Sequence, residues 1–295
     1  MIIIGSGLAG CLAGVLNQTA TICEPKEEPT SHKALLRFRS PQIGESVGIP
    51  FKQITTHKGI WMDGEPVSLS PLAISLYSQK VTGKISQRSI CNLEPVERYI
   101  APDNFHEMLL EQCNGRVSYG VDIPSVLEAK ERKISTLPMF VTAKHFNYDV
   151  DFGEKVRGIY VTRMKISNCN AYMTYYYPGH ELNPYRASIT GDTLIIESCE
   201  PIDTDDIFGV LESFGLQFET CDVEVENYEQ PNGKMSKIDE ATRKKVILDL
   251  TLKHGIYSLG RFAVWKNLLL DDVYNDILVI RTLLNKELYD HHLSL

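Results

Sequence analysis

The sequence predicts an α/β fold in which a parallel sheet with helices is interrupted by an inserted, mainly antiparallel β region. Residues 1–25 read as strand, helix, strand, because an apolar run leads into Gly-x-Gly-x-x-Gly and a second apolar run follows. Residues 156–198 change to the period-two alternation of strands, with a hairpin signal at Gly191-Asp192. Residues 239–253 return to helical spacing, and a last helix is expected after residues 271–272. The chain therefore begins and ends with Gly-turn-plus-helix units.

The first unit has the pattern of a Rossmann-like dinucleotide-binding turn. Residues 2–4 are the expected strand and residues 8–16 the helix, whose amides and positive dipole end attract a pyrophosphate. A tight turn without a ligand is the alternative for this motif alone. The predicted binding positions are Gly5, Ser6, Gly7, Leu8, Ala9 and Gly10.

A second strand at 19–24 ends in Glu24, 19 residues after Gly5. A carboxylate there accepts hydrogen bonds from a ribose 2′-OH, which favours an unphosphorylated adenosine ribose over NADP. The motif by itself leaves both FAD and NAD open.

Arg37 and Arg39 lie in a stretch at 26–60 rich in Pro, Gly and charge, which we interpret as an extended segment over a ligand. On an extended chain, residues i and i+2 face the same side. We expect these arginines to reach phosphate or the cofactor ring, with a surface salt bridge as the alternative for each. Asp103 is expected to cap a helix at 104–112, and Pro138 to end a strand at 133–139.

The β region carries polar side chains on alternate positions, which places them on one face of a sheet. They are Arg186, Ser188 and Thr190 on one strand and Tyr172, Thr174 and Tyr176 on its neighbour. A guanidinium can clamp a carboxylate or a phosphate, and an aromatic ring can stack on a base. Half-buried packing is the alternative for the tyrosines.

The remaining pattern predicts helices at 205–214 and 239–253, the latter ending at Gly255, and a strand at 222–228. A last helix follows Asp271 and Asp272, either of which would cap it. Its predicted apolar face holds Val273, Ile277, Ile280, Leu284 and Leu288.

Composition excludes several classes of protein. The net charge of −8, from 30 basic and 38 acidic residues, argues against a large nonspecific phosphate-binding surface. The seven cysteines never have Cys-x-x-Cys spacing, so we expect neither a disulfide framework nor a metal site.

No apolar run approaches the roughly 20 residues that span a bilayer. Because Met1 leads directly into the first strand, we expect a cytoplasmic protein without a cleaved targeting peptide.

Two stretches resemble the flavoprotein superfamily that includes amine oxidases and UDP-galactopyranose mutases. YSLGRFAVWKNLLLDDVYNDI resembles the mutases' Gly-Arg-aromatic-aromatic-Asp region, and KISTLPM resembles the strand that brings a Ser/Thr-x-Pro turn close to the flavin. The resemblance implies FAD, with Gly260, Arg261, Asp271 and Asp272 near it. For Arg261 an interdomain ion pair is the alternative. It also implies a discontinuous FAD-binding domain at 1–60, 99–140 and 245–295, with a substrate domain at 61–98 and 141–244.

A closer likeness is to compact phage FAD-dependent oxidoreductases of the mutase-like group, which pair stretches like PYRASITGDTLIIES and YSLGRFAVWKN. Some of these belong to thymidine hypermodification pathways and resemble a glycine-oxidising lyase. The likeness implies oxidation of a C–N bond in a glycine-modified thymine of phage DNA, in the host cytoplasm, with release of glyoxylate. Arg186, Arg261 and Tyr176 would then act on the substrate.

Two other classes of function remain open from the sequence. A flavin-dependent mutase would act on a nucleotide sugar, and a noncatalytic module would bind FAD without turnover. No nucleophile with an adjacent base is recognisable, which agrees with chemistry supplied by a cofactor.

Overall fold

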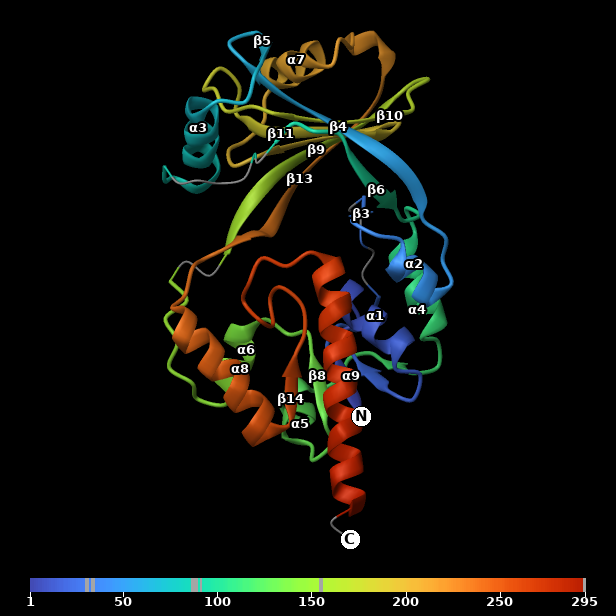
Figure 1. Ribbon diagram of the computed structural model, residues 1–295. Coiled ribbons are helices and arrows are strands. Elements are labelled where there is room, and N and C mark those ends of the chain that lie inside the picture. The colour runs from blue at the N-terminus through green and yellow to red at the C-terminus, as the bar shows by residue number, and fades with distance from the viewer. Residues whose placement is uncertain (30–31, 33–34, 86–89, 91, 154–155, 294–295) are drawn as a thin grey trace. The chain divides into compact units, whose positions relative to one another are not determined.

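The computed structural model describes residues 1–29, 32, 35–85, 90, 92–153 and 156–293 (Figure 1). The chain forms two compact units. The first comprises Met1–Lys52, Tyr99–Gly153 and Met235–Leu295, and the second comprises Gln53–Arg98 and Glu154–Lys234. Each unit is therefore assembled from segments that are distant in sequence.

A parallel five-stranded sheet in the order β14-β8-β1-β2-β7 forms the centre of the first unit. The central strand β1 places Ile3 beside Ile22 of β2 and beside Ile134 of β8. All three side chains are fully buried, as expected where helices cover a parallel sheet. The strands are β1 (Ile2–Ile4), β2 (Thr21–Cys23), β7 (Val117–Ser118), β8 (Lys133–Ser135) and β14 (Ile256–Ser258).

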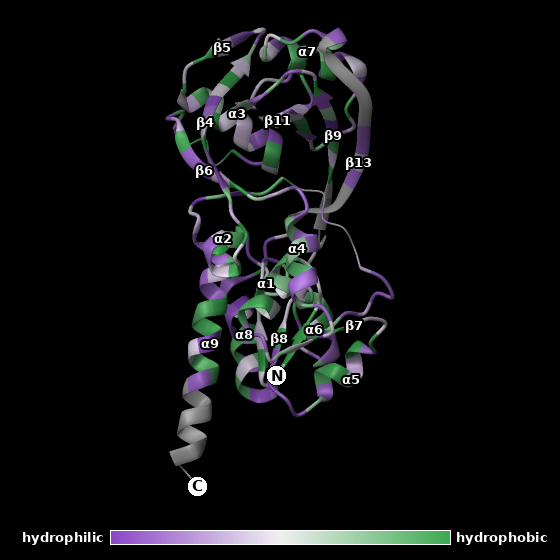
Figure 2. Ribbon diagram, turned by 90° about the vertical axis from the view of Figure 1, so that its right-hand side faces the viewer, coloured by the Kyte–Doolittle hydropathy of each residue, from purple (hydrophilic) through white to green (hydrophobic). Residues whose placement is uncertain are grey.

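Residues next to the ends of the helices in the first unit determine where these helices begin and end. Asp239 caps α8 by accepting the Thr242 N–H, and Gly255 ends α8 with a left-handed φ of 63°. Figure 2 shows apolar and polar segments alternating along α9, whose Val273 and Ile277 are buried. The helices are α1 (Leu8–Leu16), α2 (Gln42–Val47), α4 (Phe105–Gln112), α5 (Ile123–Glu128), α6 (Met139–His145), α8 (Glu240–His254) and α9 (Leu270–Leu293).

The second unit is built on a mainly antiparallel sheet in the order β13-β9-β12-β11-β10-β4-β6, with β5 paired to β4. One face packs against α7 (Thr204–Ser213) through apolar side chains such as Ala187, Ile189 and Leu211. The helix α3 (Pro71–Thr82) packs with Tyr185 and Cys199. The strands are β4 (Lys52–Met62), β5 (Glu65–Val67), β6 (Val96–Ile100), β9 (Val156–Ile166), β10 (Ala171–Tyr176), β11 (Pro184–Gly191), β12 (Thr193–Ser198) and β13 (Cys221–Met235), with a 3₁₀ turn at Phe218–Thr220.

The predicted fold class is confirmed, and so is the hairpin at Gly191-Asp192, where Gly191 has a φ of 66° between β11 and β12. The domain boundaries predicted after residues 60, 140 and 244 lie after Lys52, Gly153 and Lys234 in the compact units. The first difference has a simple cause, because residues 53–60 belong to the long strand β4 in the sheet of the second unit.

Two local predictions are wrong. The stretch predicted as extended contains the helix α2, and Phe38 and Ile43 belong to the core of the first unit; residues 30–31 and 33–34 of that stretch lie outside the described residues. The predicted cap Asp103 does not cap α4, whose N-cap is Asn104 without a side-chain hydrogen bond. Phe38 stacks on Phe51 with ring centroids 4.7 Å apart, so the apolar residues between the charges are what fold this segment. Arg37 and Phe38 form the short strand β3 (Arg37–Phe38), which pairs with Ile100 and Tyr99.

Candidate functional site

The turn between β1 and α1 requires a glycine at position 5. Gly5 has a φ of 99°, and a Cβ added there would lie 2.2 Å from the Thr136 hydroxyl oxygen. The Gly5 N–H donates to the Cys23 carbonyl at 2.9 Å, which ties the turn to the end of β2. Both the backbone conformation and the space exclude a side chain at this position.

Gly7 and Gly10 meet different constraints. A Cβ on Gly10 would lie 1.9 Å from the Gly5 carbonyl oxygen, so Gly10 permits α1 to pack closely on the strand. A Cβ on Gly7 would meet no protein atom within 4 Å, and its backbone is extended at φ −70°, ψ −179°. The protein thus needs Gly10 for its own fold, while the space in front of Gly7 is open at the N-terminus of a helix. Those are the separate roles that glycines have in a dinucleotide-binding turn.

Glu24 lies against this turn rather than in solvent. Its Oε2 accepts hydrogen bonds from the Ser6 N–H at 2.7 Å and the Ser6 hydroxyl at 2.8 Å, and its Oε1 accepts the Lys26 N–H at 3.1 Å. The residue is only 8% exposed. The carboxylate is therefore held in a fixed orientation beside the glycine turn, where a ribose hydroxyl could donate to it.

The C-terminal part of the chain returns to the same turn. After β14, the Leu259 N–H donates to the Ser135 carbonyl at 2.9 Å. Gly260 follows with a φ of 90°, and a Cβ on it would lie 3.3 Å from the Cβ of Ala9. Leu8 and Ala9, in the first turn of α1, are half-buried. A second glycine loop thus lies against the N-terminus of α1.

Arg261 follows Gly260 and is half-buried. Its guanidinium carbon lies 4.8 Å from the centroid of the Phe262 ring. Burial lowers the pKa of Arg261 from its ordinary value, because the charged form has lost part of its hydration. An anion bound beside Arg261 would stabilise the charged form of the guanidinium and raise its pKa again.

Arg39 and the two aspartates of α9 bind one another. The Arg39 N–H donates to Asp271 at 2.9 Å, and the guanidinium forms an ion pair with Asp272 at 3.1 Å. Asp272 also accepts the Leu269 N–H at 2.9 Å, so it caps the start of α9. The salt bridge considered as the alternative for Arg39 is present, and the contact of Arg39 with a cofactor stays a prediction. Arg37 is half-buried in β3, and its contact with a ligand stays a prediction.

In the second unit, Tyr176, Arg186 and Glu197 are neighbours across three strands of the sheet. The Arg186 Nε donates to Glu197 at 2.5 Å, and the charge of Glu197 raises the pKa of Arg186. The ring of Tyr176 meets that of Tyr77 edge-on, with centroids 5.4 Å apart. Arg186 therefore has a carboxylate partner within the protein. A substrate anion would have to compete with Glu197 for the Arg186 guanidinium.

Sequence reasoning missed His106, which lies beneath the glycine turn. The residue is 4% exposed, and its Nε2 lies 2.8 Å from the Ser6 carbonyl oxygen, while its Nδ1 has no hydrogen-bond partner. The Cys11 thiol donates to the same carbonyl at 2.9 Å. A histidine within an amphipathic helix carries no signal that it will support a distant loop. Thr136, by contrast, belongs to the KISTLPM stretch, and its hydroxyl donates to the Ile4 carbonyl at 2.8 Å.

Among the residues that the structure describes, no group of three or more His, Cys, Asp or Glu side chains is placed to hold a metal ion. None of the described helices is long and apolar enough to cross a bilayer.

No protein-family model matches the chain, and no curated protein matches it. Among solved structures, reduced UDP-galactopyranose mutase matches with a TM-score of 0.72 and 14% sequence identity, over 96% of this chain and 93% of that one. The chain shares its fold with UDP-galactopyranose mutase. A putrescine oxidase variant with redesigned cofactor binding has a TM-score of 0.57 at 9% identity, over 94% of this chain and 98% of its own. A mutant of PqsL from P. aeruginosa has a TM-score of 0.55 at 10% identity, over 98% and 87%.

The two glycine loops lie together at the N-terminus of α1. In this chain one loop follows β1 and the other follows β14, both strands of the parallel sheet. Gly260 of the second loop lies against Ala9. The fold expected from the predicted resemblance is thereby confirmed.

Proposed function

We propose that the chain is an FAD-dependent oxidoreductase. The observation that carries the proposal is the open space at Gly7, at the N-terminus of α1 and beside the oriented carboxylate of Glu24. This arrangement fits the pyrophosphate and adenosine ribose of a dinucleotide. The name of one structural neighbour supports a flavin, since it is described as a probable FAD-dependent monooxygenase, and another is an oxidase bound to putrescine.

The residues of the first unit would divide the work of binding. The turn around Gly7 would hold the pyrophosphate, Glu24 the ribose and Gly260 the ring system, because only a glycine allows the backbone to approach so closely. Bound FAD supplies a two-electron acceptor. Arg261 would stay beside the ring, where its positive charge favours the electron-rich reduced form.

For the substrate we propose a glycine-modified thymine in DNA, oxidised at its C–N bond. The glycine Cα loses a hydride and its nitrogen a proton, which forms a C=N bond. Water then adds to the imine carbon and releases glyoxylate, leaving a 5-aminomethyl base. Arg261 would bind the glycine carboxylate in preference to Arg186, because Glu197 already neutralises Arg186. Within the second unit, Tyr176 on the strand beside Arg186 stays the candidate for stacking on a base.

The test is the absorbance spectrum of the purified protein, followed without oxygen after addition of glycine-modified thymidine DNA. Bleaching of the flavin band with release of one glyoxylate per flavin is expected. A protein that stays yellow without releasing glyoxylate would refute this substrate, and a protein that remains colourless with added FAD would refute the oxidoreductase itself.

The similarity to reduced UDP-galactopyranose mutase favours one alternative function, a flavin-dependent mutase of a nucleotide sugar. Such an enzyme needs reduced flavin but causes no net oxidation. Conversion of UDP-galactopyranose only after dithionite reduction would support it. A flavin that no candidate substrate reduces, and that leaves the sugar unchanged, would indicate a noncatalytic module.

A further inference from the structure

The loop at 259–266, which carries Gly260 and Arg261, is fixed to the rest of the first unit along its length. The Met139 N–H donates to the Phe262 carbonyl at 2.9 Å. Within the loop, the Val264 N–H donates to Gly260 and the Lys266 N–H to Arg261, each at 3.0 Å. These bonds leave the loop few ways to move without breaking a backbone contact.

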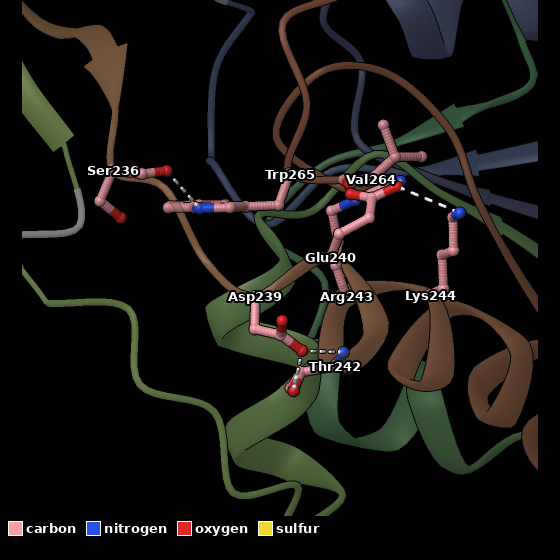
Figure 3. A network of polar contacts seen from close by, with 8 residues as sticks. All are labelled: Ser236, Asp239, Glu240, Thr242, Arg243, Lys244, Val264 and Trp265. Carbon is pink, nitrogen blue, oxygen red and sulfur yellow. Dashed lines mark hydrogen bonds and ion pairs between the residues drawn. The ribbon is translucent and has the colours of Figure 1, made fainter.

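A charged side-chain contact to this loop comes from Arg243 in the first turn of α8. Its NH1 donates to the Val264 carbonyl at 2.8 Å, while its Nε and NH2 donate to the two oxygens of Glu240 at 2.7 and 2.8 Å (Figure 3). The Arg243 side chain is 9% exposed, whereas that of Glu240 is 60% exposed. The bidentate pair thus orients a buried guanidinium whose remaining edge points to the loop.

Trp265 marks a strained point in the same loop. It is a bulky residue with a φ of 49°, in the left-handed region that favours glycine. The ring is 4% exposed and meets the rings of Phe140 and Phe152 edge-on. Its Nε1–H donates to the Ser236 carbonyl at 3.1 Å (Figure 3). A backbone conformation of this kind persists only where surrounding contacts impose it, and it occurs preferentially at functional sites.

We propose that Arg243 and Trp265 are positioning residues that hold the 259–266 loop in the conformation that receives the flavin ring. They would act through Gly260, which lies against Ala9, and through the adjacent Arg261. The inference rests on the proposed FAD site. The loop is then ordered before the cofactor binds, and the binding energy is not spent on ordering it.

The physical consequence is a change in apparent affinity. If only a fraction of the protein has the loop in place, the apparent Kd for FAD rises in inverse proportion to that fraction. Loss of one hydrogen bond from a charged donor corresponds to about a 10-fold change, and loss of one from a neutral donor to about a 5-fold change.

The experiment compares FAD with ADP as ligands of the apoprotein. ADP carries the pyrophosphate and the adenosine but lacks the ring system, so it does not use the 259–266 loop. We expect R243M to weaken FAD binding about 10-fold and W265F about 5-fold, while ADP binding changes less than about 2-fold. The visible circular dichroism of bound flavin should change in both variants, because it reports the surroundings of the ring.

K253M is the matched control, since Lys253 lies on the same helix and forms its ion pair at 2.9 Å with Asp249 of that helix. It should leave both affinities and the flavin spectrum unchanged. Equal losses of FAD and ADP affinity in R243M and W265F would indicate a merely structural role and overturn the inference. Unchanged FAD affinity in both variants would overturn it as well. A wild-type protein that binds ADP but no FAD would refute the proposed function, and the inference with it.

Discussion

The same substitution should have opposite effects at Gly7 and at Gly10. An alanine Cβ at Gly7 meets no protein atom within 4 Å, and the extended backbone there suits any residue. We expect Gly7→Ala to change the free energy of unfolding of the apoprotein by about 1 kcal/mol or less, the difference between Gly and Ala at an N-cap. The new methyl group would occupy the space that the pyrophosphate must enter. Loss of two charge-assisted hydrogen bonds corresponds to an FAD affinity about 100-fold weaker.

Gly10→Ala should instead damage the apoprotein. Its Cβ would lie 1.9 Å from the Gly5 carbonyl oxygen and 2.9 Å from the Gly5 carbonyl carbon, so α1 must move away from the strand. Overpacking of this kind costs about 1–3 kcal/mol, which lowers the Tm by roughly 2–5 °C in a protein of this size. The better helix propensity of alanine offsets only part of that cost.

Thermal unfolding of the apoproteins and titration with FAD give the two measurements. The expected pattern is a near-normal Tm with poor binding for Gly7→Ala and a lowered Tm for Gly10→Ala. Wild-type FAD affinity in Gly7→Ala would refute the assignment of the open space to the pyrophosphate. An unchanged Tm in Gly10→Ala would refute the close contact between α1 and the Gly5 carbonyl.

Three further predictions concern single side chains. Glu24→Gln should weaken FAD about 10-fold but FMN little, because FMN lacks the adenosine ribose; equal losses in titrations of both flavins would contradict this role. Burial, Cys113 and Glu24 together raise the pKa of Cys11 from 9.0 to about 12. The protonated Cys11 thiol therefore stabilises the folded state fully below pH 9, and this stabilisation is lost as the pH rises toward 12. The decline of Tm with pH in that window should therefore be shallower in Cys11→Ala, and an unchanged slope would contradict the shift. In steady-state kinetics Arg261→Met should raise KM more than Arg186→Met does, since Glu197 already pairs with Arg186; the reverse order would assign the substrate anion to Arg186.

The first unit could be predicted from the sequence where its signals are local. The observed bounds of β1 and α1 coincide with the predicted strand at 2–4 and helix at 8–16. All three glycines of the turn lie within ten residues of one another, so their spacing in the sequence is enough to predict the geometry of the turn. The hairpin at Gly191-Asp192 is local in the same sense.

Contacts between distant segments could not be predicted in this way. The ion pair of Arg39 with Asp272 and the contact of Gly260 with Ala9 join residues from opposite ends of the chain. The stretch around Phe38 looked extended because its charges and prolines dominate, while the stacking of Phe38 on Phe51 is decided by tertiary packing. Arg243 had no signal at all, because its role depends on which carbonyl lies beyond the end of its side chain.

The two arginines proposed for the substrate differ in a way that only the structure reveals. Arg186 lies 41% exposed beside Glu197, so its charge is already balanced and an incoming anion must displace a carboxylate. Arg261 is half-buried against Phe262, and burial lowers its pKa, which means that its charged form is poorly solvated. An anion that reaches Arg261 replaces part of the hydration that burial has removed from its guanidinium. Because Arg261 follows Gly260 directly, the loop that would contact the flavin also presents the cation, and cofactor and substrate anion would meet at one short segment of backbone.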